Sequence, residues 1–180
     1  MAVTVTAYFI IPIYTILFVS GTNWFQTNFS VIGNVAGREE AFVLWGLIVG
    51  IYFYYCLRHI IRRMPEPPRF SWLVSLALLL LVFAVTTPYL PETLPLKSFL
   101  HIIFAFMASV CLILSLFFIL LKLAEKDKAS YKPWLAVLGL IVIISAVLLI
   151  IVGIISSALE IFFTLSMTLI VYRLYLRICR

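Results

Sequence analysis

Long uninterrupted apolar stretches constrain this chain more than any other feature. Six are long enough to cross a bilayer, whose hydrocarbon core of about 30 Å is spanned by about 20 apolar helical residues. They cover residues 3–20, 41–57, 71–87, 98–121, 134–155 and 158–176. Hydrophobic residues make up 65% of the chain and charged residues only 11%, too apolar a composition for a soluble domain of this size to bury. The sequence therefore predicts an all-α polytopic membrane protein, a single transmembrane domain built as a six-helix bundle.

The division between the last two stretches is set by a few polar residues. Residues 134–172 form one apolar run of roughly twice the membrane thickness, so the chain must turn inside it. Gly153, Ser156, Ser157 and Glu160 are its concentrated polar or flexible residues, and we place the turn at about Ser156. Ser157 and Glu160 have capping-box spacing, which predicts that Glu160 accepts the Ser157 backbone N–H.

The first stretch has two features of its own. Pro12 lies inside it and predicts a kink. Residues 1–6 carry no Lys or Arg, whereas a secretory signal peptide begins with a positive region. We therefore expect a retained helix.

Basic residues predict the orientation of the chain. Most of the 13 Lys and Arg residues fall in alternate connections and would share one side of the membrane; these are Arg58, Arg62, Arg63, Arg69, Lys122, Lys126, Lys128, Lys132, Arg173, Arg177 and Arg180. The opposite side would hold Arg38 and Lys97. Because short basic loops stay in the cytoplasm, we predict that both termini are cytoplasmic.

The predicted outer face holds the polar side chains that are unusual in so apolar a chain. The first loop, residues 21–40, is long and rich in amides and hydroxyls, and long ordered loops are often functional. Such groups either bind a polar ligand, for example a lipid head group, or cap helices and close turns. The candidate ligand-binding residues on this face are Asn28, Ser30, Arg38, His101, Ser157 and Glu160.

His101 is the most informative of these candidates. It lies about one turn inside the predicted fourth span, where an ionisable ring is costly unless it is paired. Its expected partner is Glu92, Glu160 or Arg38. A His–Glu pair can perform general acid–base chemistry, or it can serve as a structural hydrogen bond between helices. Ser157 is a weak candidate nucleophile because no GxSxG motif surrounds it.

The predicted inner face carries a short basic cluster of Arg58, Arg62 and Arg63 beside His59. Such a cluster attracts anionic lipid head groups by about 1 kcal/mol per residue. The alternative is that these residues only set the topology.

Several classes of function are disfavoured by what the sequence lacks. The three cysteines show no zinc-like spacing and there are only two histidines, so we expect no metal. No Walker loop, HExxH or dinucleotide fingerprint is present, and we expect no cofactor. The basic residues form no nucleic-acid face.

Three kinds of function remain open. The first is a protein that binds or handles a lipid at an outer-face polar pocket. The second is a non-enzymatic accessory or scaffold subunit with a protein partner within the bilayer. The third is a small transporter, which the absence of mid-membrane Asp and Lys disfavours. We expect a binder rather than an enzyme.

The chain also resembles a known superfamily. The segments "NFSVIGN…GREEAF", "TTPYLPETLPLK", "SFLHIIFAFMAS" and "SSALEIFF" are similar to those of the DRAM and GPI-lipid-remodelling-factor superfamily and its prokaryotic relatives of unknown function. Ser30, Gly33, His101 and Glu160 carry most of the resemblance. It implies a six-helix bundle, and it links eukaryotic members to lipid handling, membrane trafficking or autophagy. We favour a prokaryotic plasma membrane over a eukaryotic endomembrane.

Overall fold

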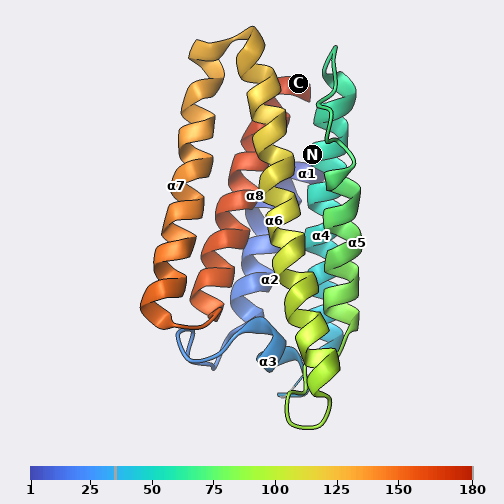
Figure 1. Ribbon diagram of the computed structural model, residues 1–180, viewed down its shortest axis with the longest axis vertical. Helices are drawn as coiled ribbons and strands as arrows, with labels where there is room; N and C mark the ends of the chain where they lie inside the picture. The colour runs from blue at the N-terminus through green and yellow to red at the C-terminus, as the bar shows by residue number, and fades with distance from the viewer. Residues whose placement is uncertain (35, 180) are drawn as a thin grey trace.

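The computed structural model describes residues 1–34 and 36–179, and every regular element in this part of the chain is a helix. The long helices lie side by side in an elongated bundle (Figure 1). The elements in chain order are α1 (Ala2–Val5), η1 (Thr6–Ile10), α2 (Ile11–Phe18), α3 (Phe29–Asn34), α4 (Glu39–Arg63), α5 (Leu73–Thr86), α6 (Pro95–Lys126), α7 (Lys128–Val152) and α8 (Ser157–Cys179).

Four helices are long and apolar enough to cross a membrane. These are α4, α6, α7 and α8, with 25, 32, 25 and 23 residues. At 1.5 Å per residue each of them exceeds the hydrocarbon core of about 30 Å. Two further apolar helices, Ala2–Phe18 and Leu73–Thr86, are shorter. The structure thus supplies four helices of spanning length where the sequence predicted six spans.

The connections between helices gather at the two ends of the bundle (Figure 1). We call one the basic end; it holds the α4–α5 connection (residues 64–72) and the α6–α7 connection (residue 127). We call the other the polar end; it holds residues 19–34 and 36–38 and the α5–α6 and α7–α8 connections. The residues expected on the outer face therefore lie at the same end of the bundle.

The turn between α7 and α8 lies where the sequence analysis placed it. Gly153 ends α7 with φ +79°, the left-handed conformation that glycine adopts without strain, and its N–H donates to the Leu149 carbonyl at 2.8 Å. Ser156 directly precedes α8 and caps its start, because its Oγ accepts the Leu159 N–H at 3.4 Å. The predicted capping box of Ser157 and Glu160 is wrong. The Ser157 N–H and the Glu160 carboxylate each bond to the first loop and not to one another.

The first helix contains a wide turn directly before Pro12. Residues 6–10 form the π-helical segment η1, and the Ile11 N–H donates to the Thr6 carbonyl five residues back. Proline has no N–H to donate within a helix, and single π turns are a common way to absorb such a gap. This irregularity stands where the sequence predicted a kink.

Side-chain hydrogen bonds hold the first helix on the bundle. Trp45 of α4 donates its indole N–H to Thr15 Oγ1 at 3.0 Å, and both side chains are buried. The Tyr172 hydroxyl of α8 donates to Thr4 Oγ1 at 2.9 Å. Polar bonds of this kind join helices in an apolar surrounding, where packing has little hydrophobic driving force.

α4 has more buried residues than any other helix in the described structure, and a glycine sets its distance from α5. A methyl group on Gly46 would collide with Val85 Cγ1 and lie 3.2 Å from Val85 Cβ. Valine is stiff at χ1, so its side chain cannot turn away easily. α7 is at the other extreme, because Leu138 and Ile141 are its only buried residues in the described structure.

We predict that Gly46→Ala lowers the stability of the bundle. Overpacking of a close contact costs about 1–3 kcal/mol, which outweighs the gain of about 1 kcal/mol from replacing a helical glycine by alanine. Gly139→Ala on α7 is the matched control, since nothing lies within 4 Å of its added methyl group. Thermal unfolding in detergent should show a lower melting temperature for Gly46→Ala and an unchanged or higher one for Gly139→Ala. Equal shifts in both variants would contradict the packing argument.

Candidate ligand site at the polar end

A short helix, α3, forms inside the first loop and carries Ser30. Asn28 caps its start, with its Oδ1 accepting the Val31 N–H at 2.8 Å, and asparagine is among the preferred residues for this position. Asn34 closes the helix by donating to the Ser30 carbonyl at 3.0 Å. A methyl group at Gly33 would lie 2.8 Å from Phe42 Cβ, so this glycine permits the close packing of α3 on α4. The amides of Asn28 and Asn34 therefore serve as caps.

The Ser30 side chain meets His101 of α6. Ser30 Oγ lies 2.6 Å from His101 Nε2, and His101 Nδ1 lies 2.9 Å from the Thr87 carbonyl oxygen. A carbonyl can only accept, so Nδ1 carries the hydrogen. In the neutral imidazole, Nε2 is then the acceptor and the Ser30 hydroxyl donates to it.

The surroundings of His101 exclude water from its ring. The residue is 1% exposed, and the rings of Tyr89 and Phe42 have centroids 5.5 and 6.1 Å from the imidazole. The Thr87 carbonyl is available because Thr87 ends α5 in an extended conformation (ψ 119°). The expected pairing of His101 with a charged residue is wrong: its ring bonds a hydroxyl and a backbone carbonyl.

Glu160 belongs to the same region through the first loop. Its Oε2 accepts the Phe29 N–H at 2.7 Å, next in the chain to Ser30. The Ser157 N–H donates to the Thr27 carbonyl at 2.7 Å and the Ala158 N–H to the Trp24 carbonyl at 2.9 Å. The first N–H groups of a helix have no acceptor within the helix. Here carbonyls of the first loop accept two of them.

The structure brings together three of the predicted ligand residues, which come from three different segments. Ser30, His101 and Glu160 gather around α3. Arg38 is bonded to other residues: its Nη1 donates to the Phe18 carbonyl at 2.7 Å and to the Ser20 carbonyl at 3.4 Å. Ser157 is fully buried, and its Oγ has no hydrogen-bond partner in the described residues.

Some contributors to the site were missed by sequence analysis. Thr87 acts through its backbone carbonyl, which leaves no signal in the residue type. Tyr89 and Phe42 look like ordinary interface and core aromatics, and only their placement beside His101 distinguishes them. The helical state of α3 had a usable signal, because Asn28 three residues before Val31 has the spacing of an N-cap.

The basic end lies at the opposite end of the bundle from this site (Figure 1). Arg62 and Arg63 are exposed in the last turn of α4, and Arg58 is half-buried. Lys122 pairs with Glu66 at 3.1 Å and with Glu125 at 2.9 Å.

These contacts also bear on the charge state of the basic end. The Lys122 ammonium, by hydrogen bonding and charge, holds the pKa of the Glu66 carboxyl below its usual range. Both carboxylates that pair with Lys122 are largely exposed, and exposed pairs contribute little to stability.

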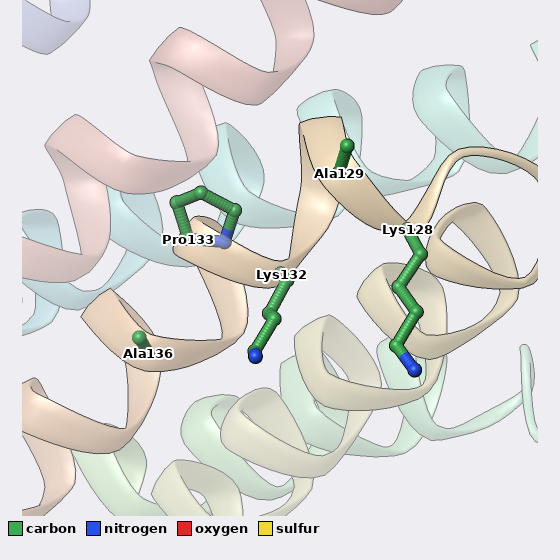
Figure 2. A pocket seen from close by; sticks show the side chains of 5 residues that line it. All are labelled: Lys128, Ala129, Lys132, Pro133 and Ala136. Atoms are coloured by element: carbon green, nitrogen blue, oxygen red, sulfur yellow. The ribbon is translucent and has the colours of Figure 1, made fainter.

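Two surface hollows lie elsewhere on the molecule. One, of about 600 Å³, is an open recess along the first turns of α7, with Lys128 and Lys132 projecting from the same side of the helix (Figure 2). The other, of about 470 Å³, is an apolar groove between α7 and α8 that reaches from Phe162 to Arg173. Neither of the two is lined by Ser30, His101 or Glu160.

The described part of the chain contains no group of three His, Cys, Asp or Glu side chains that could hold a metal ion. Comparison with known proteins yields no relative: no protein-family model, no curated protein and no solved structure matches the chain.

We predict that Glu160→Ala destabilises the polar end. The substitution leaves the Phe29 N–H without its acceptor, and an unsatisfied buried donor costs about 1–3 kcal/mol. Glu160→Gln keeps a carbonyl oxygen at this place and should lose less. The readouts are the melting temperature in detergent and amide hydrogen exchange of residues 24–34, which should speed up in Glu160→Ala.

Glu92 offers a matched control for this prediction. It is an exposed acidic residue in the α5–α6 connection at the same end of the bundle. Glu92→Ala should leave the exchange of residues 24–34 unchanged. If Glu160→Ala exchanged no faster than Glu92→Ala, the carboxylate would not be holding α3.

Proposed function

We propose that this chain is an integral membrane protein with six spans and that it binds a membrane lipid at the polar end. Four helices of spanning length support membrane insertion. Connectivity supports α5 as a further span: α4 ends at the basic end and α6 begins at the polar end (Figure 1). The intervening α5, of 14 residues and about 21 Å, must carry the chain back across.

The orientation follows from charge. Arg62 and Arg63 at the end of α4 and Lys126 at the end of α6 belong to the basic end. Short basic connections remain in the cytoplasm, which places the basic end and both chain termini inside and the polar end outside. The same arginines, together with Arg58, are suited to contact anionic lipid head groups on the inner surface.

The observation that carries the lipid proposal is the gathering of Ser30, His101 and Glu160 around one short helix at the polar end. These residues come from three segments far apart in the sequence, and Ser30 Oγ lies 2.6 Å from His101 Nε2. The site stands at the bilayer surface, where a lipid head group is the most abundant polar ligand. The same three residues, together with Gly33, carry most of the resemblance to the DRAM and GPI-lipid-remodelling superfamily.

A second candidate function is that of an accessory subunit, which one observation favours. α7 lies at the edge of the bundle and exposes a row of large apolar side chains, among them Leu140, Ile143, Val147 and Ile150. Such a face suits either lipid tails or a helix of another membrane protein. Transport, the third possibility, has no comparable support: the mid-span hydroxyls of Ser109 and Ser115 bond to carbonyls of their own helix.

We predict that the protein retains a specific lipid when it is extracted gently from its own membrane. Native mass spectrometry with lipid identification should find one lipid class on the wild type. His101→Ala removes the hydrogen-bond partner that positions Ser30 and should lose most of that lipid. Ser109→Ala is the control, because Ser109 Oγ donates at 3.1 Å to the Ala105 carbonyl, away from the site, and it should retain the lipid.

The alternatives give different spectra. A lipid-free wild-type monomer would overturn the lipid proposal. A stable complex with another polypeptide would favour the accessory-subunit function over the lipid proposal. Melting temperatures of all variants show whether a loss of lipid reflects a loss of fold.

A further inference from the structure

The hydrogen bond between Ser30 and His101 differs from the other serine contacts in the helices. Ser109 and Ser115 donate to the carbonyls four residues back, at 3.1 and 2.7 Å, which is the usual way for a helical hydroxyl to satisfy itself. The Ser30 hydroxyl donates instead to a ring nitrogen 71 residues away. The contact therefore joins a hydroxyl to a base.

The geometry is that of an activated nucleophile. A serine hydroxyl becomes nucleophilic when a general base within about 2.6–3.2 Å takes its proton, and a third group orients that base. His101 Nε2 meets the first requirement at 2.6 Å. The Thr87 carbonyl meets the second, because it accepts the Nδ1–H at 2.9 Å and thereby leaves the Nε2 lone pair facing Ser30.

Burial of the two residues differs in a way that suits this role. His101 is 1% exposed and packs against the rings of Tyr89 and Phe42, so its orientation is fixed. Ser30 itself is partly exposed. The histidine is thus buried, and the serine is partly exposed.

We propose that Ser30 and His101 form a catalytic pair that transfers the acyl group of a membrane ester lipid, an inference that rests on the lipid binding proposed above. Ser30 Oγ attacks the ester carbonyl carbon while His101 Nε2 takes the hydroxyl proton. The bond from that carbon to the alkoxy oxygen then breaks, and Nε2 returns the proton to the leaving alcohol. An acyl group remains on Ser30.

The second half of the reaction restores the serine. Water, or the hydroxyl of a second lipid, gives its proton to Nε2 and attacks the acyl carbon. The Ser30–acyl bond breaks, and Ser30 Oγ regains the proton from Nε2. No oxidant, reductant or metal takes part. The substrate class follows from the place of the pair at the membrane surface, where esters of long-chain fatty acids are abundant.

Glu160 contributes as a positioning residue. Its carboxylate holds the Phe29 N–H at 2.7 Å, and Phe29 precedes Ser30 in the chain. Displacement of α3 by a fraction of its length would lengthen the Ser30–His101 contact, and small misplacements of a nucleophile are costly in rate.

The test uses the full-length protein in detergent or nanodiscs and a long-chain alkyl fluorophosphonate as the probe. An activated serine displaces fluoride and keeps the phosphonyl group, which peptide mass spectrometry locates. We expect labelling at Ser30 in the wild type and none at this site in Ser30→Ala. His101→Ala should label at least about 100-fold more slowly, the lower range for loss of a general base. Ser109→Ala should label as the wild type does.

A second measurement follows the reaction itself. Wild-type protein in vesicles of diacyl phospholipid should release fatty acid or pass it to a second lipid, and product analysis tells hydrolysis from transfer. Ser30→Ala should lose this activity while its melting temperature stays near that of the wild type. A folded wild type that neither labels at Ser30 nor turns over lipid would overturn the catalytic pair.

The two proposals fail in different ways. If the wild type retained lipid without labelling or turnover, the lipid-binding function would be supported and the catalytic pair would not. The Ser30–His101 hydrogen bond would then be a structural contact between α3 and α6. Absence of retained lipid together with absence of labelling would remove both. Labelling that persists at equal rate in His101→Ala would show that the histidine is not the base.

Discussion

Hydrogen bonds between the first loop and the start of α8 hold the polar end together. The N–H groups of Ser157 and Ala158 need acceptors that their own helix lacks, and carbonyls of the first loop supply them at 2.7 and 2.9 Å. In the opposite direction, the Glu160 carboxylate of α8 accepts the Phe29 N–H of the first loop. Near an apolar phase an unpaired backbone group is costly, so each side satisfies the other. α3 owes its position to this exchange, and the position of Ser30 depends on α3.

The site also depends on how the bundle distributes its packing. α4 contacts two neighbours closely: Gly46 allows α5 to approach, and Trp45 bonds Thr15 of the first helix. α5 then ends at Thr87, whose carbonyl orients His101 of the neighbouring α6. α7 stands at the edge and contributes nothing to the site. Precise contacts thus surround the polar end, while the edge helix is free to face lipid.

Sequence reasoning reached the candidate residues but not their partners. Ser30, His101 and Glu160 stood out because polar groups are rare in an apolar chain, and a lone intramembrane histidine is a functional candidate by default. The charged partners expected for His101 were wrong, because a hydroxyl and a backbone carbonyl satisfy its ring. The capping box at Glu160 was wrong for a related reason: a distant N–H competes for the carboxylate, and local spacing cannot register that competitor.

The sequence by itself determined what depends on composition and local order: an all-helical chain, apolar helices of spanning length, the turn near Ser156 and the sorting of basic residues into alternate connections. These follow from the cost of exposing apolar side chains to water and of placing charges in hydrocarbon. Only the tertiary structure decided that Ser30 meets His101, because that contact joins residues 71 positions apart. It requires α3, α5 and α6 to be placed at once, and such placement arises from packing and hydrogen bonds between helices.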